Sequence, residues 1–119
     1  MELKLNVYKT RKLKEVEKTL VTDDFKLSTG ICEDMLNIIN IDIFEGVNAL
    51  SEEDQILEVM KMVVGGFGVF KELLKETFDD LTDDEIERTD IREIAVVVVR
   101  VVKFSLAGLF SAFGGKRKN

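Results

Sequence analysis

The residues best suited to chemistry lie in one acidic stretch. The fourteen residues Phe78–Ile91 hold seven carboxylates, which could bind calcium or act as general acids and bases. A calcium-binding loop needs oxygen ligands at positions 1, 3, 5, 7, 9 and 12, with glycine at position 6. If the loop began at Asp79, its third position would be Leu81; if it began at Asp80, its sixth would be Glu85. Because neither frame supplies the required residues, we expect no metal site here.

The same stretch has the features of a helix start. Thr82 and Glu85 have the spacing of a capping box, in which each side chain accepts a hydrogen bond from the other residue's backbone N–H. Leu81 and Ile86 occupy the two positions of a hydrophobic staple around it. Carboxylates are also favourable at a helix N-terminus because the helix dipole is positive there. We therefore interpret the acidic residues as signals that begin a helix.

Other catalytic and metal-binding side chains are scarce. The chain has no histidine, which is the commonest metal ligand and the usual general base near neutral pH. Its single cysteine, Cys32, has no histidine to activate it, and we predict that it is a small hydrophobic residue on a helix. From the residues we predict no catalytic residues, no cofactor and no metal.

Charge and hydropathy limit the partners of this 119-residue chain. Residues 1–40 carry seven basic and seven acidic side chains, residues 41–94 five and sixteen, and residues 95–119 five and none. A net acidic chain without a basic stripe is a poor ligand for nucleic acid, so we expect no nucleic-acid partner. Charged residues interrupt the most apolar segment, 91–113, so we expect no membrane span. The first residues also lack the apolar core of a secretion signal.

Alternating hydropathy predicts a β-hairpin at the start of the chain. Leu3, Leu5 and Val7 alternate with polar residues, as in a half-buried strand. A second, less regular alternation over Glu15–Val21 predicts the partner strand. The charged link between them lacks the Asn-Gly signal of a tight turn, so we expect a longer loop.

Helical spacing follows from residue 28 onwards. Ser28 and Ser51 are placed to cap two helices, and the glycines within 65–68 predict a break before the next one. Asp90 and Glu93 have the spacing of a second capping box. Residues 41–44 fit either a short strand or the end of a helix, and both alternatives stay open.

The last segment predicts a long apolar helix over 91–113. Its four consecutive valines favour a strand, but some twenty residues without a turn are too many for an ordinary strand. Such a helix is either central in its own core or buried against another chain. We predict an α+β fold, mostly α-helical, with an N-terminal β-hairpin packed on four to five helices. The expected organisation is a single domain over 1–113 and a flexible basic tail over 114–119.

The order of these parts resembles the tail assembly chaperones of long-tailed (siphovirus-type) phages or prophages of Gram-positive bacteria. The resemblance covers nearly the whole chain and includes "CEDMLNIINID", the segment "LLKETFDDLTDDEIERTDIREI", the apolar C-terminal segment and the final Gly-Gly-Lys. The most specific match is Leu81–Ile86 followed by Thr89. The resemblance implies a non-enzymatic protein that binds and solubilises the tape measure protein and assists polymerisation of the tail tube protein. It also implies a place in the host cytoplasm and absence from the mature virion.

Within that expectation, the apolar C-terminal helix is the predicted binding surface. Its helical spacing would suit an apolar stripe on a client helix, and we also expect homo-oligomers. The predicted partner-binding residues are Val102, Leu106, Leu109, Phe110 and Phe113. Two other classes compete with a chaperone: a small helical regulatory or nucleic-acid-associated protein, and a membrane-active small phage protein.

Overall fold

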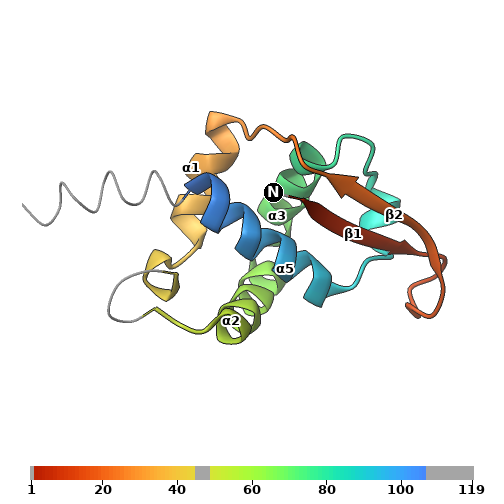
Figure 1. Cartoon of the computed structure of the whole chain (residues 1–119), viewed down its shortest axis with the longest axis horizontal. Coiled ribbons are helices and arrows are strands. Elements are labelled where there is room, and N and C mark those ends of the chain that lie inside the picture. The colour runs from red at the N-terminus through yellow and green to blue at the C-terminus, as the bar shows by residue number, and fades with distance from the viewer. Residues whose placement is uncertain (1, 45–48, 107–119) are drawn as a thin grey trace, which may run out of the picture.

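A two-stranded hairpin and five α-helices make up the fold seen in the computed structural model, which describes residues 2–44 and 49–106 (Figure 1). The elements in chain order are β1 (Leu3–Tyr8), β2 (Val16–Thr22), α1 (Thr29–Ile38), the 3₁₀ turn η1 (Ile41–Ile43), α2 (Glu52–Gly65), α3 (Phe67–Thr77), α4 (Asp83–Ile86), α5 (Ile91–Val101) and the π turn η2 (Val102–Leu106). The prediction of a mixed α+β fold that is mostly helical is confirmed.

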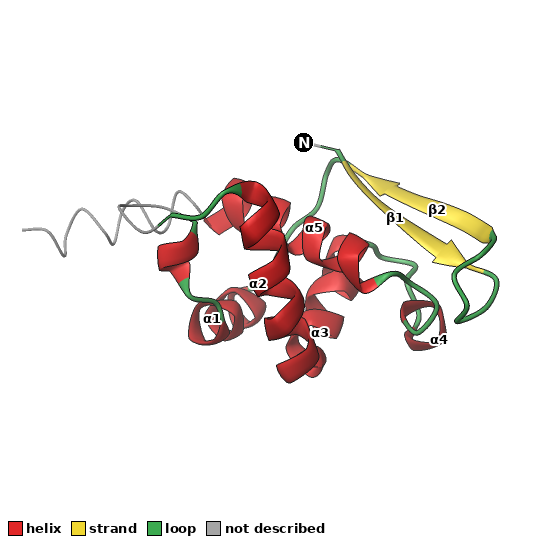
Figure 2. Ribbon diagram, turned by 90° about the horizontal axis from the view of Figure 1, so that it is seen from below, coloured by secondary structure: helices red, strands yellow, loops and turns green. Residues whose placement is uncertain are grey.

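The hairpin presents one face to the helices. β1 and β2 pair antiparallel, with Leu5 opposite Leu20, and the register shifts near Val7 and Tyr8. Leu3, Leu5 and Val7 are completely buried, as the period-two pattern predicts. β1 packs against α5 and α4, and Figure 2 shows α4 beneath the two strands. The hairpin therefore closes one side of the core.

Helix α5 is the centre of that core. It lies between β1 on one side and α2 on the other (Figure 1). Its four valines face packed neighbours because the helix has protein around most of its circumference. The buried residues of α5 and the position after it are Ile94, Ala95, Val97, Val98, Val99, Val101 and Val102.

The prediction of a long apolar C-terminal helix is not supported. In the part of the chain that the structure describes, α5 ends at Val101 and the backbone continues as a π turn to Leu106. The sequence pattern was nearly apolar all round because this short helix is central in its own core. Residues 107–113, the rest of the predicted helix, and the predicted tail 114–119 lie outside the described residues.

The predicted helix caps are present. The Ser28 and Ser51 hydroxyls accept hydrogen bonds from the backbone N–H groups of Ile31 and Asp54, at 3.1 and 3.2 Å. Asp90 caps α5 by accepting from the N–H of Arg92 at 2.8 Å. Residues 41–43, where the sequence left strand and helix end open, form the 3₁₀ turn η1.

Candidate binding surface

The acidic stretch of the sequence forms a structural junction. Thr82 and Glu85 make both bonds of the capping box: the Thr82 N–H donates to Glu85 Oε1 at 3.0 Å, and the Glu85 N–H donates to Thr82 Oγ1 at 3.2 Å. Leu81 and Ile86 are both buried in the core. Within residues 2–44 and 49–106, no group of three or more acidic or cysteine side chains is arranged to hold a metal ion.

Ion pairs join this junction to the rest of the fold. Lys18 on β2 forms an ion pair with the largely buried Glu85. The hydrogen bond from Lys18 lowers the pKa of the Glu85 carboxyl, against the opposing effect of burial. Arg88 donates to the backbone oxygen of Tyr8 at 2.7 Å and pairs with Glu17 and Asp84 at 3.2 and 3.1 Å. The junction thus ties α4 to both strands.

Glu93 has a different role from the predicted one. Instead of closing a capping box with Asp90, its carboxylate accepts from the N–H of Asn6 at 3.0 Å and from the hydroxyl of Tyr8 at 2.8 Å. The bond to Glu93 raises the pKa of the Tyr8 hydroxyl because the charged phenolate would lose it. The capping-box prediction for Glu93 is therefore wrong. The carboxylate thus accepts from one backbone N–H on the open edge of β1, beside which no further strand lies in residues 2–44 and 49–106.

Four of the five predicted partner-binding residues lie at or beyond the end of the described chain. Val102 is 1% exposed and closes the protein's own core, so it has almost no surface for a partner. Leu106 is the last residue of η2 and of the described chain. Leu109, Phe110 and Phe113 lie outside the described residues, and their binding role stays a prediction.

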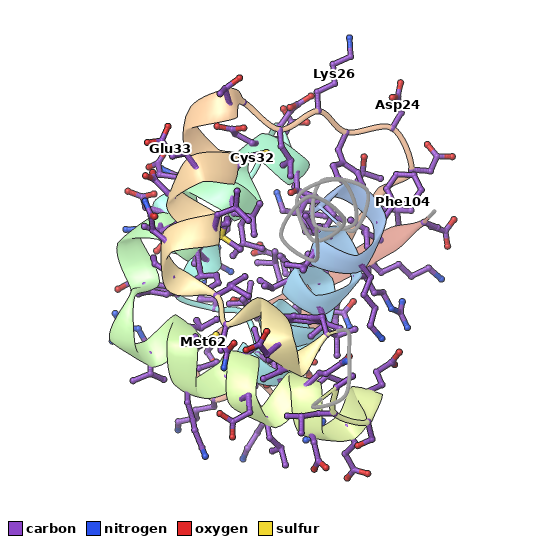
Figure 3. All side chains as sticks on the ribbon, turned by 90° about the vertical axis from the view of Figure 1, so that its left-hand side faces the viewer. Asp24, Lys26, Cys32, Glu33, Met62 and Phe104 are labelled. Carbon is purple, nitrogen blue, oxygen red and sulfur yellow. The ribbon has the colours of Figure 1, made fainter. Side chains whose placement is uncertain are left out.

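Figure 3 looks along the molecule from the end that carries α1 and the end of α5. Phe104, just after α5, is 61% exposed, and its ring centroid lies 6.2 Å from that of Phe25.

Cys32 lies half-buried on α1, where burial raises the pKa of its thiol. A raised thiol pKa gives less of the reactive thiolate at neutral pH, so Cys32 is poorly suited to act as a nucleophile.

An unpredicted apolar surface lies along α2. Spacing of three and four residues buries Ile56, Val59 and Val63 against the core. On the outward side of the same helix, Leu57 is 44% exposed and Val64 is 72% exposed. Their i, i+7 separation puts them on one face, about 10.5 Å apart at 1.5 Å per residue. We call the surface formed by Leu50, Leu57, Met60 and Val64 the α2 outer face.

A hollow of about 450 Å³ lies at the N-terminal part of this face, lined by Leu50, Asp54, Leu57, Glu58, Met60 and Lys61. Gln55 fixes one wall, because its side-chain amide donates to the backbone oxygens of Ile43 and Leu50, both at 3.1 Å. Gln55 is itself buried, so the segment that carries Leu50 is anchored to α2.

A helix break follows the C-terminal end of this face. α2 ends at Gly65, and α3 starts at Phe67 after Gly66, as the glycines in the sequence predicted. Phe67 is 37% exposed, with the Lys71 ammonium 6.0 Å from its ring centroid. It is the first residue of α3, where fewer neighbours surround a side chain than in the middle of a helix.

The polar side chains around the hollow are mostly acidic. Helix α2 carries Glu52, Glu53, Asp54 and Glu58 against the single cation Lys61. Lys61 pairs with Glu58 at 3.2 Å, and Lys103 pairs with Glu52 at 3.6 Å. In the described parts of the chain, neither Glu53 nor Asp54 has an ion-pair partner within 4 Å. The α2 outer face is thus apolar with a net negative border.

None of the helices described in 2–44 and 49–106 has the length and hydropathy needed to cross a bilayer. Comparisons of the chain with protein-family models, with curated proteins and with solved structures gave no match.

Proposed function

We propose that this protein is a phage tail assembly chaperone that binds and solubilises the tape measure protein while the tail tube protein polymerises around it. The order of the hairpin, the capping box and the apolar helix in the sequence, which resembles that family, supports the proposal. So does a fold in which the acidic stretch around Thr82 takes part in structure and leaves binding to other surfaces.

The strongest structural support is the α2 outer face. Leu57 and Val64 expose apolar surface on a helix that buries Ile56, Val59 and Val63 in the core. Exposed apolar groups with a polar border are typical of protein-binding sites. A chaperone for a long helical client needs such a surface, together with enough net charge to remain soluble when the client is absent. The formal net charge of −6 meets the second requirement.

Co-expression tests the proposal. The tape measure protein would be expressed alone, with this chain, and with an unrelated small acidic protein at the same level. We expect a soluble complex only with this chain, because burial of the client's apolar stripes contributes about 25 cal/mol per Å² before the costs of association. A client that stays equally insoluble in all three cases contradicts the proposal.

A second pair of cultures locates the predicted C-terminal contribution. The variant Leu109→Asp/Phe113→Asp would be compared with wild type in the same experiment, after circular dichroism has shown that it is folded. If the client stays soluble with the variant, Leu109 and Phe113 are not needed for binding, and the proposed chaperone function is unaffected.

A further inference from the structure

We infer that the α2 outer face is the docking site for an amphipathic helix whose apolar stripe is flanked by lysine or arginine. This inference rests on the proposed function, because it identifies the chemistry of the client segment. It places binding on α2, which the sequence did not single out.

The shape of the face favours a helical ligand. Leu57 and Val64 are two turns apart on one side of α2, which matches the apolar repeat of a second helix lying alongside. The hollow beside Leu57 is about 450 Å³, the size of site that accepts large apolar side chains. Leu50 and Met60 line that hollow, and the hydrocarbon part of Lys61 adds to its apolar wall. One anchor side chain of the ligand would enter the hollow while the next lies over Val64.

Charge determines which helix is favoured. Four carboxylates and one lysine on α2 give this helix a net charge of −3, and that lysine already pairs with Glu58. Glu53 and Asp54 lie at the N-terminal end of the face, where a ligand cation could reach them. A basic border on the ligand would gain attraction and faster association, whereas an acidic border would meet like charge.

The same charge argues against a second copy of this chain as the occupant. A two-fold contact brings the same patch of both copies together. It would therefore bring together two α2 helices of net charge −3, each with a single lysine that already pairs with Glu58, so like charge opposes the second copy. The basic residues Lys116, Arg117 and Lys118 of the chain's own end are the other source of compatible charge, and the experiment below separates them from an external helix.

Fluorescence anisotropy with a labelled peptide tests the inference. The probe is a helical peptide of about 18 residues, or five turns, with leucines at three- and four-residue spacing and lysines beside them. A matched peptide has glutamates in place of the lysines. We expect the full chain to bind the lysine peptide at least roughly tenfold more tightly than the glutamate peptide, and raised salt to reduce the difference. Equal affinity for the two peptides would contradict the charge argument.

Matched variants of the protein locate the site. Val64→Lys places a charge on the α2 outer face, and Val21→Lys places the same charge on β2, where Val21 is 53% exposed. We expect Val64→Lys to weaken the binding of the lysine peptide by roughly tenfold and Val21→Lys to leave its affinity nearly unchanged. Glu53→Gln/Asp54→Asn should weaken the same peptide and reduce its salt dependence, while the exposed pair Asp79→Asn/Asp80→Asn should not. Equal effects of Val64→Lys and Val21→Lys would overturn the assignment.

Two results would identify a different occupant. If Lys116→Glu/Arg117→Glu/Lys118→Glu makes the protein bind the lysine peptide more tightly, the chain's own end competes for the face and the assignment to an external helix is wrong. If Val64→Lys changes only the oligomeric state in sedimentation, with no effect on peptide binding, the face joins copies of this chain.

Client solubility separates this inference from the proposed function. A client that Val64→Lys protects as well as wild type refutes the docking site alone, and a client that wild type fails to protect refutes the function.

Discussion

The junction of the hairpin with α4 and α5 differs from the α2 outer face. At the junction, each central polar side chain has a specific partner. On the α2 outer face, apolar side chains are exposed to solvent beside acidic side chains that have no ion pair within the part of the chain that the structure describes. Glu85, Arg88 and Glu93 each bind groups from β1 or β2 that are distant in the sequence. In the described residues Glu53 and Asp54 have no ion-pair partner, and Leu57 and Val64 are 44% and 72% exposed. Acidic residues that look alike in the sequence thus divide into one set that builds the fold and another that is available for a ligand.

The largest difference should appear on truncating a leucine in each region. Leu5 is fully buried beneath α5, so Leu5→Ala should cost about 2–5 kcal/mol of unfolding free energy through lost burial and the cavity left behind. Leu57→Ala on the α2 outer face should change it by only about 0.5 kcal/mol, because the side chain is 44% exposed. Urea denaturation measures both. Equal losses would mean that the α2 outer face is part of the core.

Removing one carboxylate from each region should give the next largest contrast. Glu93→Ala leaves the Asn6 N–H and the Tyr8 hydroxyl without their acceptor and should cost about 1–3 kcal/mol. Glu53→Ala removes only a favourable charge from the first turn of α2 and should cost less than about 1 kcal/mol. Thermal unfolding compares the stabilities of the two variants. A greater loss of stability for Glu53→Ala would contradict the division between the two regions.

The capping box should have a smaller effect that is independent of metal. Thr82→Ala should destabilise the protein by about 0.5–2 kcal/mol, whereas Thr82→Ser keeps the capping hydroxyl and should remain near wild type. Calcium should not raise the melting temperature of any of the three proteins. A rise for wild type at micromolar calcium would favour a cation site in the acidic stretch.

The smallest effect should be one of pH. Because the folded state lowers the pKa of Glu85, its contribution to stability is complete above the ordinary carboxyl pKa of about 4.3 and is lost as pH falls through the lower folded value. Wild type should therefore lose more unfolding free energy than Lys18→Gln on acidification from about pH 5 to pH 3. Parallel pH profiles for the two proteins would show that this ion pair does not stabilise the fold.

Local patterns predicted local structure well. Alternating Leu3, Leu5 and Val7 and the capping residues Ser28 and Thr82 depend on neighbours within a few positions, and the structure bears them out. The bonds of Glu93 cross more than eighty residues of chain, so a capping pattern was the only local signal for it. Its partners, Asn6 and Tyr8, could be identified only from the folded structure.

The exposed apolar residues of α2 were harder to predict for a related reason. The long apolar pattern after Ile91 fitted either a helix central in its own core or one buried against another chain, and α5 is apolar because β1 and α2 surround it. The exposed apolar residues of α2 are few, and the same heptad spacing also fits buried positions. Leu57 and Val64 could have been noted as apolar residues outside the Ile56, Val59 and Val63 stripe, but their exposure depends on which helices pack nearby.

Amide hydrogen exchange of the full chain, with and without the tape measure protein, tests the division between the two regions most directly. Binding at the α2 outer face should slow exchange over 52–65 and leave 82–93 nearly unchanged. The same measurement on Val64→Lys should show the slowing lost or much reduced, while Val21→Lys should behave as wild type. Slowed exchange confined to the hairpin and 82–93, with none on α2, would contradict the account.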